Sequence, residues 1–260
     1  MTSSLLVVLF CIGFVGSFLS GLVGIGGSII KYPMLLYIPS ALGVAVYTAH
    51  EVSGISAVQV FFATLSGVWA LRKDNLIHYK LVVYMGSAII LGSFAGGYGG
   101  KYLAPETINL IYGSLAAIAA IMMFIPKVDI DHMSLQQVTF NRTIAVLSAL
   151  AVGMASGIVG AAGAFILVPI MLLVLKIPTR VTIASSLAIT FLSSIGTTIG
   201  KVMAGDVLFW PSVIMVVASI LAAPLGARIS KRINTKALQT ILAVMILGTA
   251  IKIWTNLFTS

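Results

Sequence analysis

One stretch of this chain, Ser20-Gly-Leu-Val-Gly-Ile-Gly-Gly-Ser-Ile-Ile-Lys-Tyr-Pro-Met-Leu-Leu36, occurs twice and decides the fold. The second copy, 136 residues later, reads Ser156-Gly-Ile-Val-Gly-Ala-Ala-Gly-Ala-Phe-Ile-Leu-Val-Pro-Ile-Met-Leu172. Eight of the seventeen positions are identical. Because a composition biased toward apolar residues gives only about two identities by chance, we interpret the chain as an internal duplication.

Each copy places several glycines and a proline inside a run of mostly apolar residues. At 1.5 Å per helical residue, a run of this length barely crosses a bilayer. Short apolar segments with Gly/Pro interruptions, at matching positions of two halves, are the best sequence indication of a transporter's binding site. We therefore expect a broken helix in each half, with the substrate held between the two.

The composition is that of an integral membrane protein. Hydrophobic residues make up 60% of the 260 residues and charged residues 8%, whereas a soluble domain carries about 25% charged residues. The apolar runs are longer than ten residues and lack the alternation of strands, so helices are predicted. No Lys or Arg precedes the first run, which we interpret as a membrane helix and not as a signal peptide.

Ten membrane segments are predicted, five in each half. The halves are residues 1–126 and 142–260, and a polar linker, 127–141, separates them. The predicted segments are 4–20, 22–37, 42–71, 81–98, 107–125, 142–157, 158–175, 181–200, 208–226 and 237–257.

The positions of the basic residues predict that the two halves are inverted. If every segment crosses the membrane, the odd number in each half turns the second half over, and eleven Lys and Arg residues then share one side. If the glycine segments do not cross, the basic clusters fall on opposite faces. The positive-inside rule favours the first arrangement, with both termini outside. The predicted fold is an all-α integral membrane protein of two inverted-topology repeats, each of about five segments with one Gly/Pro-broken helix.

The net charge of +9 is interpreted as this accumulation of Lys and Arg in cytoplasmic loops, and no nucleic-acid partner is expected.

The first glycine stretch is predicted to form half of an anion site. Gly24, Gly26 and Gly27 break the helix at mid-membrane, and Ser28 is placed to cap the half-helix that follows. Free backbone N–H groups and the positive end of the helix dipole would then face the substrate, an arrangement that suits an anion. The alternative is that these glycines only allow close helix packing.

The second half is predicted to supply the facing half of the site. Gly160 and Gly163 correspond to glycines of the first copy and present a second helix end to the anion. Ser185 and Ser186 are candidate neutral donors that line the same cavity. The alternative for these hydroxyls is a bond to the carbonyl of their own helix.

In the first half, three Lys, His or Glu residues lie within the predicted membrane segments. Lys31 is a candidate contact for the anion, and His50 with Glu51 is a candidate proton-coupling or gating pair. Each charge at bilayer depth costs roughly 2.5–3.5 kcal/mol, so such residues usually face a partner or a water-filled path. The alternatives are a buried Lys31–Glu51 ion pair that fixes helix register, or positions near the interface from which the side chains snorkel.

The duplicated segments, the turns Ile38-Pro39-Ser40 and Ile177-Pro178-Thr179, and the stretch Ala184-Ser-Ser-Leu187 together resemble the TauE/SafE family of sulfite exporters. The similarity runs through both halves. The second copy departs from the glycine-rich pattern at 161, 162 and 164, where the chain has alanine. The resemblance implies transport of small sulfur-containing anions, such as sulfite and sulfonates, across the bacterial inner membrane.

The expected partners are a small anionic substrate and membrane lipid, with protons as a candidate coupling ion and a homodimer as a candidate assembly. No cofactor, metal site or catalytic residue is expected. One alternative function is a passive anion channel. A membrane-embedded enzyme is disfavoured, because the chain has three His, one Cys and neither a His-Glu-x-x-His nor a Gly-x-Ser-x-Gly motif.

Overall fold

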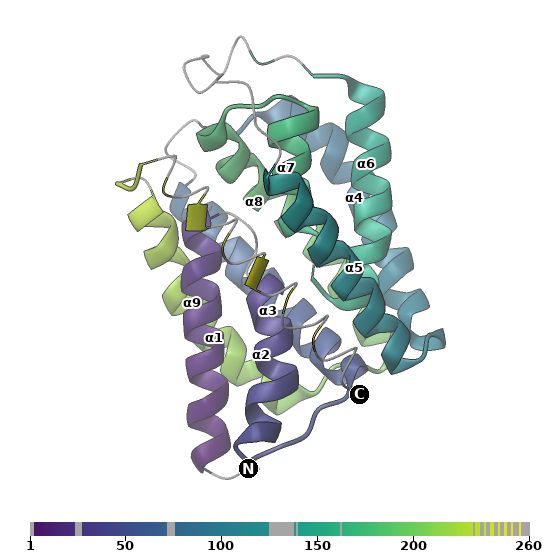
Figure 1. The fold of residues 1–260 in the computed structure, drawn as a ribbon, viewed down its shortest axis with the longest axis vertical. Helices are drawn as coiled ribbons and strands as arrows, with labels where there is room; N and C mark the ends of the chain where they lie inside the picture. The colour runs from purple at the N-terminus through teal and green to yellow at the C-terminus, as the bar shows by residue number, and fades with distance from the viewer. Residues whose placement is uncertain are drawn as a thin grey trace.

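The computed structural model describes residues 3–23, 28–71, 76–124, 138, 140–161, 163–230 and scattered residues between 232 and 255. Within these residues the regular elements are helices, with no strand. In chain order they are α1 (Ser3–Val23), α2 (Ser28–Ala41), α3 (Ala49–Leu71), α4 (Tyr79–Gly99), the 3-10 turn η1 (Gly100–Tyr102), α5 (Pro105–Phe124), α6 (Arg142–Val159), α7 (Ala164–Pro169), the π-helical turn η3 (Ile170–Val174), α8 (Thr179–Ala204) and α9 (Phe209–Ser230) (Figure 1).

Seven of the helices are long and apolar enough to cross a membrane: α1, α3, α4, α5, α6, α8 and α9. The glycine stretches precede shorter helices, since α2 has 14 residues and α7 has 6. The chain is therefore a multi-pass, all-helical membrane protein. The tenth predicted segment, 237–257, lies largely outside the described residues.

The third predicted segment, 42–71, was wrong at its start, because α3 begins at Ala49. The residues before it form a turn in which Gly43 has a φ of +64°. Thr48 and Glu51 cap the N-terminus of α3 with two reciprocal hydrogen bonds. The Glu51 carboxylate accepts from the Thr48 N–H at 2.8 Å, and the Thr48 hydroxyl accepts from the Glu51 N–H at 3.2 Å. This capping box fixes the helix start, which hydropathy alone does not report.

Helix α1 packs along α9, and the two run in the same direction. Gly13 lies against Met215, and further along both helices Gly21 lies against Ala223. A Cβ atom at Gly21 would lie 2.1 Å from the Ala223 carbonyl oxygen. Only glycine therefore allows this approach of the two backbones.

Helix α4 packs along α6 in the same manner and also in parallel. Gly92 lies against Leu150, and Gly96 lies against Met154. A Cβ atom at Gly96 would lie 2.0 Å from the Met154 carbonyl oxygen. Glycine at both positions therefore lets the backbones of α4 and α6 approach closely.

Helices α3 and α8 lie between these two pairs and are antiparallel (Figure 1). The start of α3 meets the end of α8, where Gly54 lies against Asp206. The end of α3 meets the start of α8, where Gly67 lies against Leu187.

The remaining directions follow from the neighbours of α8. Helix α4 is parallel to α8, since Gly86 lies against Leu192 and Gly200 against Tyr98. After the left-handed turn at Gly205 the chain reverses into α9, which packs against α1 and α3. Helices α1, α3 and α9 thus run one way, and α4, α6 and α8 run the other way.

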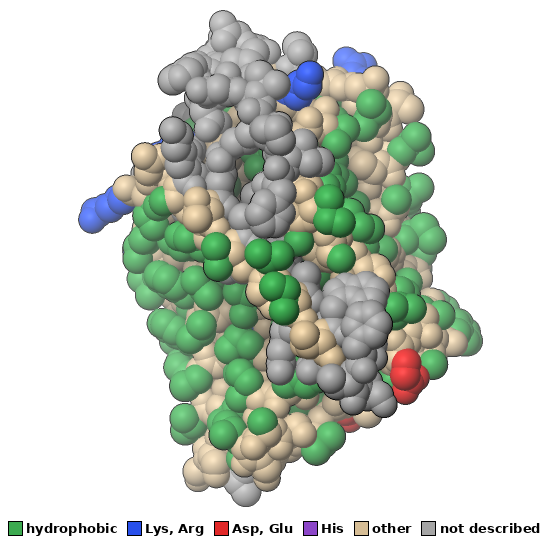
Figure 2. Space-filling model, viewed as in Figure 1, with side chains coloured by type: hydrophobic (Ala, Val, Ile, Leu, Met, Phe, Trp, Pro, Cys, Tyr) green, Lys and Arg blue, Asp and Glu red, His purple; other side chains and the backbone are tan. Residues whose placement is uncertain are grey.

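Opposite charges gather at opposite ends of the bundle. In the face shown in Figure 2, Lys and Arg side chains lie at the upper end and Asp and Glu side chains at the lower end. Basic residues lie at the starts of α4, α6 and α8 and at the end of α9. The helix directions bring these helix ends to the same end of the bundle. The described basic residues at that end are Lys80, Arg142, Lys176, Arg180, Arg228 and Arg232.

Candidate functional site

A cluster of four polar side chains is buried between α1, α2, α3 and α9. Its members are Ser17, Lys31, Gln59 and Ser219, and each has 0% of its surface exposed. Gln59 lies near the middle of α3 and Ser219 near the middle of α9. Since both helices are long enough to span a bilayer, the cluster lies close to the midplane of the membrane. We call these four residues the Lys31 cluster.

Hydrogen bonds order the neutral members of the Lys31 cluster. The Ser219 hydroxyl donates to the Met215 carbonyl at 2.6 Å, and the Ser17 hydroxyl donates to Ser219 Oγ at 2.7 Å. Gln59 Nε2 donates to Ser219 Oγ at 2.7 Å, to Ser17 Oγ at 3.1 Å and toward the Gly13 carbonyl at 3.4 Å. Because a carbonyl only accepts, the Gly13 contact fixes which end of the Gln59 amide faces α1.

Lys31 brings a positive charge to this position with little to balance it. Its aliphatic stem lies against Gly16, where a Cβ atom would come within 2.1 Å of Lys31 Cγ. Its Nζ donates to Ser17 Oγ at 3.5 Å, a long hydrogen bond. No carboxylate of the described residues pairs with it. A buried ammonium without a counter-charge is costly, so the position favours a bound anion.

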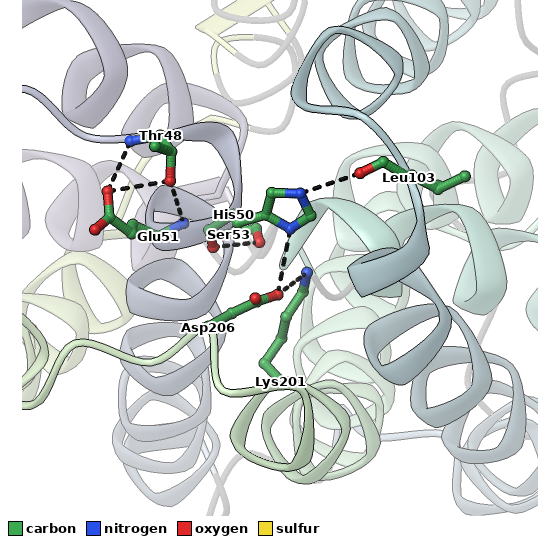
Figure 3. A network of polar contacts seen from close by, with 7 residues as sticks. All are labelled: Thr48, His50, Glu51, Ser53, Leu103, Lys201 and Asp206. Carbon is green, nitrogen blue, oxygen red and sulfur yellow. Dashed lines mark hydrogen bonds and ion pairs between the residues drawn. The ribbon is translucent and has the colours of Figure 1, made fainter.

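A second polar network joins α3, α8 and the turn before α9 near the opposite end from the basic residues (Figure 3). Lys201, fully buried, pairs with Asp206 at 2.9 Å. The same Asp206 oxygen lies 3.7 Å from His50 Nδ1. The other ring nitrogen of His50 lies 3.1 Å from the Leu103 carbonyl oxygen. The network thus ties the start of α3 to the end of α8, to the turn before α9 and to Leu103, which follows η1.

Glu51 and His50, predicted as a pair, make separate contacts. The Glu51 carboxylate bonds Thr48 in the capping box, while His50 faces Asp206 (Figure 3). The alternative of a Lys31–Glu51 ion pair is wrong, because the Lys31 ammonium contacts Ser17. A role of either residue in coupling or gating stays a prediction. Glu51 already has a local structural role.

The second glycine stretch forms a tight reversal between α6 and α7. Gly160 and Gly163 both have left-handed backbones, with φ of +75° and +74°. A Cβ atom at Gly160 would lie 2.0 Å from the Ser53 carbonyl oxygen, and one at Gly163 would lie 2.7 Å from Val152 Cγ1. Glycine is therefore needed here for conformation and for close packing alike. Anion binding at these residues stays a prediction.

The corresponding stretch of the first copy is only partly described. Gly24, Gly26 and Gly27 lie outside the described residues, and Ser28 is placed only as the first residue of α2. One feature does connect the two copies. Tyr32 stacks on Tyr112 at 4.5 Å between ring centroids, and Tyr112 contacts Phe165 at 6.1 Å. A buried aromatic row therefore links α2 through α5 to α7.

Ser185 and Ser186 are fully buried near the start of α8. Ser185 Oγ accepts from the backbone N–H of His78, just before α4, at 2.9 Å. The Ser186 hydroxyl donates to the Ile183 carbonyl of its own helix at 3.1 Å. These contacts join α4 to α8, and substrate binding by the two serines stays a prediction.

Sequence reasoning missed Ser17, Gln59 and Ser219 in the first cluster and Asp206 with Lys201 in the second. Gln59 offered a usable signal, because an amide in the middle of a long apolar run needs a partner. The serines gave none, since hydroxyls in membrane helices commonly bond their own backbone.

Comparison with known proteins identifies the family. The model of the family "Sulfite exporter TauE/SafE" matches residues 9–253. The probable membrane transporter protein YunE of Bacillus subtilis is 23% identical over 93% of this chain and 94% of its own length. A probable membrane transporter protein of Xylella fastidiosa is 32% identical over 71% of this chain and 69% of its own length. The probable membrane transporter protein MJ0441 of Methanocaldococcus jannaschii is 26% identical over 92% of this chain and 91% of its own length.

No solved structure matches the chain. The family match nevertheless covers nearly its whole length. The chain therefore belongs to the TauE/SafE sulfite exporter family, whose members are membrane transporters and not enzymes.

Proposed function

We propose that this member of the TauE/SafE family is a secondary transporter of small sulfur-containing anions, sulfite and sulfonates, which bind at the Lys31 cluster. One observation carries the proposal: a fully buried lysine near the midplane has no carboxylate partner among the described residues. An anion of the family's substrate class supplies the missing counter-charge. Charge-assisted hydrogen bonds to Lys31 then hold it in place.

In this proposal the two halves are inverted repeats around the substrate. The sequence copies pair α1 with α6, and the predicted segments pair α3 with α8 and α4 with α9. Each pair is antiparallel, which supports the proposal. The stretches Gly24–Ser28 and Gly160–Gly163 then face the anion with their helix ends. The aromatic row of Tyr32, Tyr112 and Phe165 connects the two stretches, so movement of one reaches the other.

The proposed orientation places the basic end of the bundle in the cytoplasm of a bacterial cell and the network of His50, Asp206 and Lys201 outside. Cysteine labelling from the periplasm tests it. A cysteine at Lys101 should be labelled, whereas one at Lys73 or Lys231 should be protected. Opposite exposure of Lys73 and Lys231 would end the inverted-repeat proposal.

Coupling is proposed to act through the same outer network, with protons as the coupling ion. His50 and Asp206 are titratable, lie 3.7 Å apart, and join α3 to the turn between α8 and α9. Protonation of either side chain changes the electrostatic attraction between His50 and Asp206, and therefore how strongly this turn binds to α3.

Counterflow in proteoliposomes tests the transport proposal. Vesicles that contain the protein and unlabelled sulfite should take up labelled sulfite transiently above equilibrium, with saturation, and a pH gradient should change the rate. Lys31→Arg should retain part of this activity and Lys31→Ala almost none. Linear, non-saturating flux without counterflow would identify a passive channel instead.

A further inference from the structure

We infer that the Lys31 cluster selects a singly charged oxyanion that also carries a hydrogen-bond donor, such as hydrogensulfite or a hydroxyl-bearing sulfonate. The inference deepens the proposed function and rests on it. It follows from the one acceptor and the one cation that the cluster leaves unused.

First, nearly all the hydroxyl and amide protons of the cluster already make hydrogen bonds within the protein. The Ser219 hydroxyl proton goes to the Met215 carbonyl, and that of Ser17 goes to Ser219 Oγ. The Gln59 amide protons point toward the two serine oxygens and the Gly13 carbonyl. The hydroxyls and the amide nitrogen therefore have no proton left for a ligand. Among the described residues, the Lys31 ammonium makes one such contact, to Ser17, and an ammonium has three donors.

The second step concerns the charge. Lys31 is the one ionic member of the cluster, and none of the described carboxylates reaches it. A monoanion neutralises this charge. A dianion would leave one negative charge uncompensated at a position with 0% exposure, which is strongly unfavourable.

The third step concerns Gln59 Oε1. This oxygen is buried and has no hydrogen-bond partner among the residues that the structure describes. Gln59 Nε2 and Lys31 Nζ lie 3.1 Å and 3.5 Å from the same Ser17 oxygen, so the two side chains approach each other at Ser17. In our proposal one small anion bridges them. Its oxyanion accepts from Lys31, and its O–H donates to Gln59 Oε1. An anion with acceptors alone leaves Oε1 unsatisfied.

The test compares two sulfonates of equal charge and equal heavy-atom count. Isethionate carries a terminal hydroxyl, and 1-propanesulfonate has a methyl group in its place. Binding is measured by calorimetry on the full-length protein in lipid nanodiscs. We expect isethionate to bind about tenfold more tightly, which equals about 1.4 kcal/mol. Sulfate, a dianion without a donor, should compete at least about tenfold less well than isethionate.

Gln59→Met removes the acceptor and keeps the length of the side chain. The variant should lose the preference for isethionate, so that the two sulfonates bind with about equal affinity. The control is Thr64→Val, also in α3, which removes a buried hydroxyl that bonds the Val60 carbonyl of its own helix. This control should retain the preference.

Equal wild-type affinities for the two sulfonates would overturn the inference and leave the transport proposal standing. Equal losses for both sulfonates in Gln59→Met would do the same. Absence of any sulfonate or sulfite binding to the folded wild type would overturn the proposed function as well. The wild-type preference needs no variant, so the inference remains testable even where Gln59→Met does not fold.

Discussion

Two lysines of the described chain are fully buried, Lys31 in α2 and Lys201 in α8, and their surroundings differ. Lys201 has the Asp206 carboxylate at 2.9 Å, five residues along the chain. Lys31 has one hydroxyl at 3.5 Å. A buried ion pair that satisfies itself is a structural element. A buried cation that no described carboxylate pairs keeps its electrostatic attraction for a ligand, and the proposed function assigns Lys31 to binding on this difference.

The same contrast divides the two copies of the duplicated stretch. Lys31 corresponds to Leu167, and Ser17 corresponds to Gly153. Where Ser17 donates to Ser219, Gly153 packs against Ile89, whose carbonyl oxygen would lie 2.8 Å from a Cβ atom. The scaffold is repeated but the polar chemistry is not. In the proposed function, the polar side chains that bind the anion therefore come from the first copy and not from the second.

The largest expected effect comes from breaking the paired lysine. Asp206→Ala leaves Lys201 buried and without its partner, and should lower the free energy of unfolding by about 3 kcal/mol or more. Lys201→Met in the same chain should recover much of this loss, since both charges are then gone. Thermal melting of the three purified variants checks the prediction. A double variant as unstable as Asp206→Ala would show that the pair is not what stabilises this end.

The unpaired lysine should respond in the opposite way. Lys31→Met keeps the packing of the stem and removes an uncompensated charge, so the melting temperature without anion should stay level or rise. Sulfite affinity should fall about ten- to a hundredfold, the loss of one charge-assisted hydrogen bond of roughly 1.5–3 kcal/mol. Melting temperature and sulfite affinity, measured on the wild type and on Lys31→Met, check this prediction. A clear loss of stability with unchanged binding would make Lys31 structural, like Lys201.

Glu51 sharpens the comparison with a smaller effect. Glu51→Ala removes the capping-box acceptor of α3 and should cost about 0.5–2 kcal/mol of stability. Because Glu51 bonds Thr48 and not Lys31, the effects of Glu51→Ala and Lys31→Met should add within about 0.5 kcal/mol. A double-mutant cycle on melting measures this. A strong coupling between the two stability effects would support a Lys31–Glu51 ion pair after all.

A change of similar size is expected at Gly205, which has a left-handed backbone (φ +81°) but nothing within 4 Å of a Cβ atom. Gly205→Ala should cost only the backbone strain, about 1–2 kcal/mol. Gly160→Ala combines the same strain with a contact of 2.0 Å to the Ser53 carbonyl and should cost clearly more. Equal melting temperatures for the two variants would mean that the reversal before α7 relaxes freely.

The sequence by itself determined the class of the protein, its duplication and most of its helices, and it indicated Lys31 as a cation within an apolar segment. Apolar length and composition report whether a segment is compatible with lipid, and a lysine inside such a segment stands out because its burial is costly. The Thr48–Glu51 capping box is a local pattern that the sequence also contains. The apolar residues before it led to a predicted start of the helix that was too early.

Only the tertiary structure decided what surrounds the two lysines. Ser17 and Ser219 are 202 residues apart, and His50 meets Asp206 from another helix. Hydropathy reports the distance of a segment from water, not the rotation of each helix about its axis. That rotation is set by glycine contacts such as Gly13 on Met215 and Gly21 on Ala223, which turn Ser17 of α1 and Ser219 of α9 toward each other. Contacts between helices that are distant in sequence therefore fixed the composition of the site.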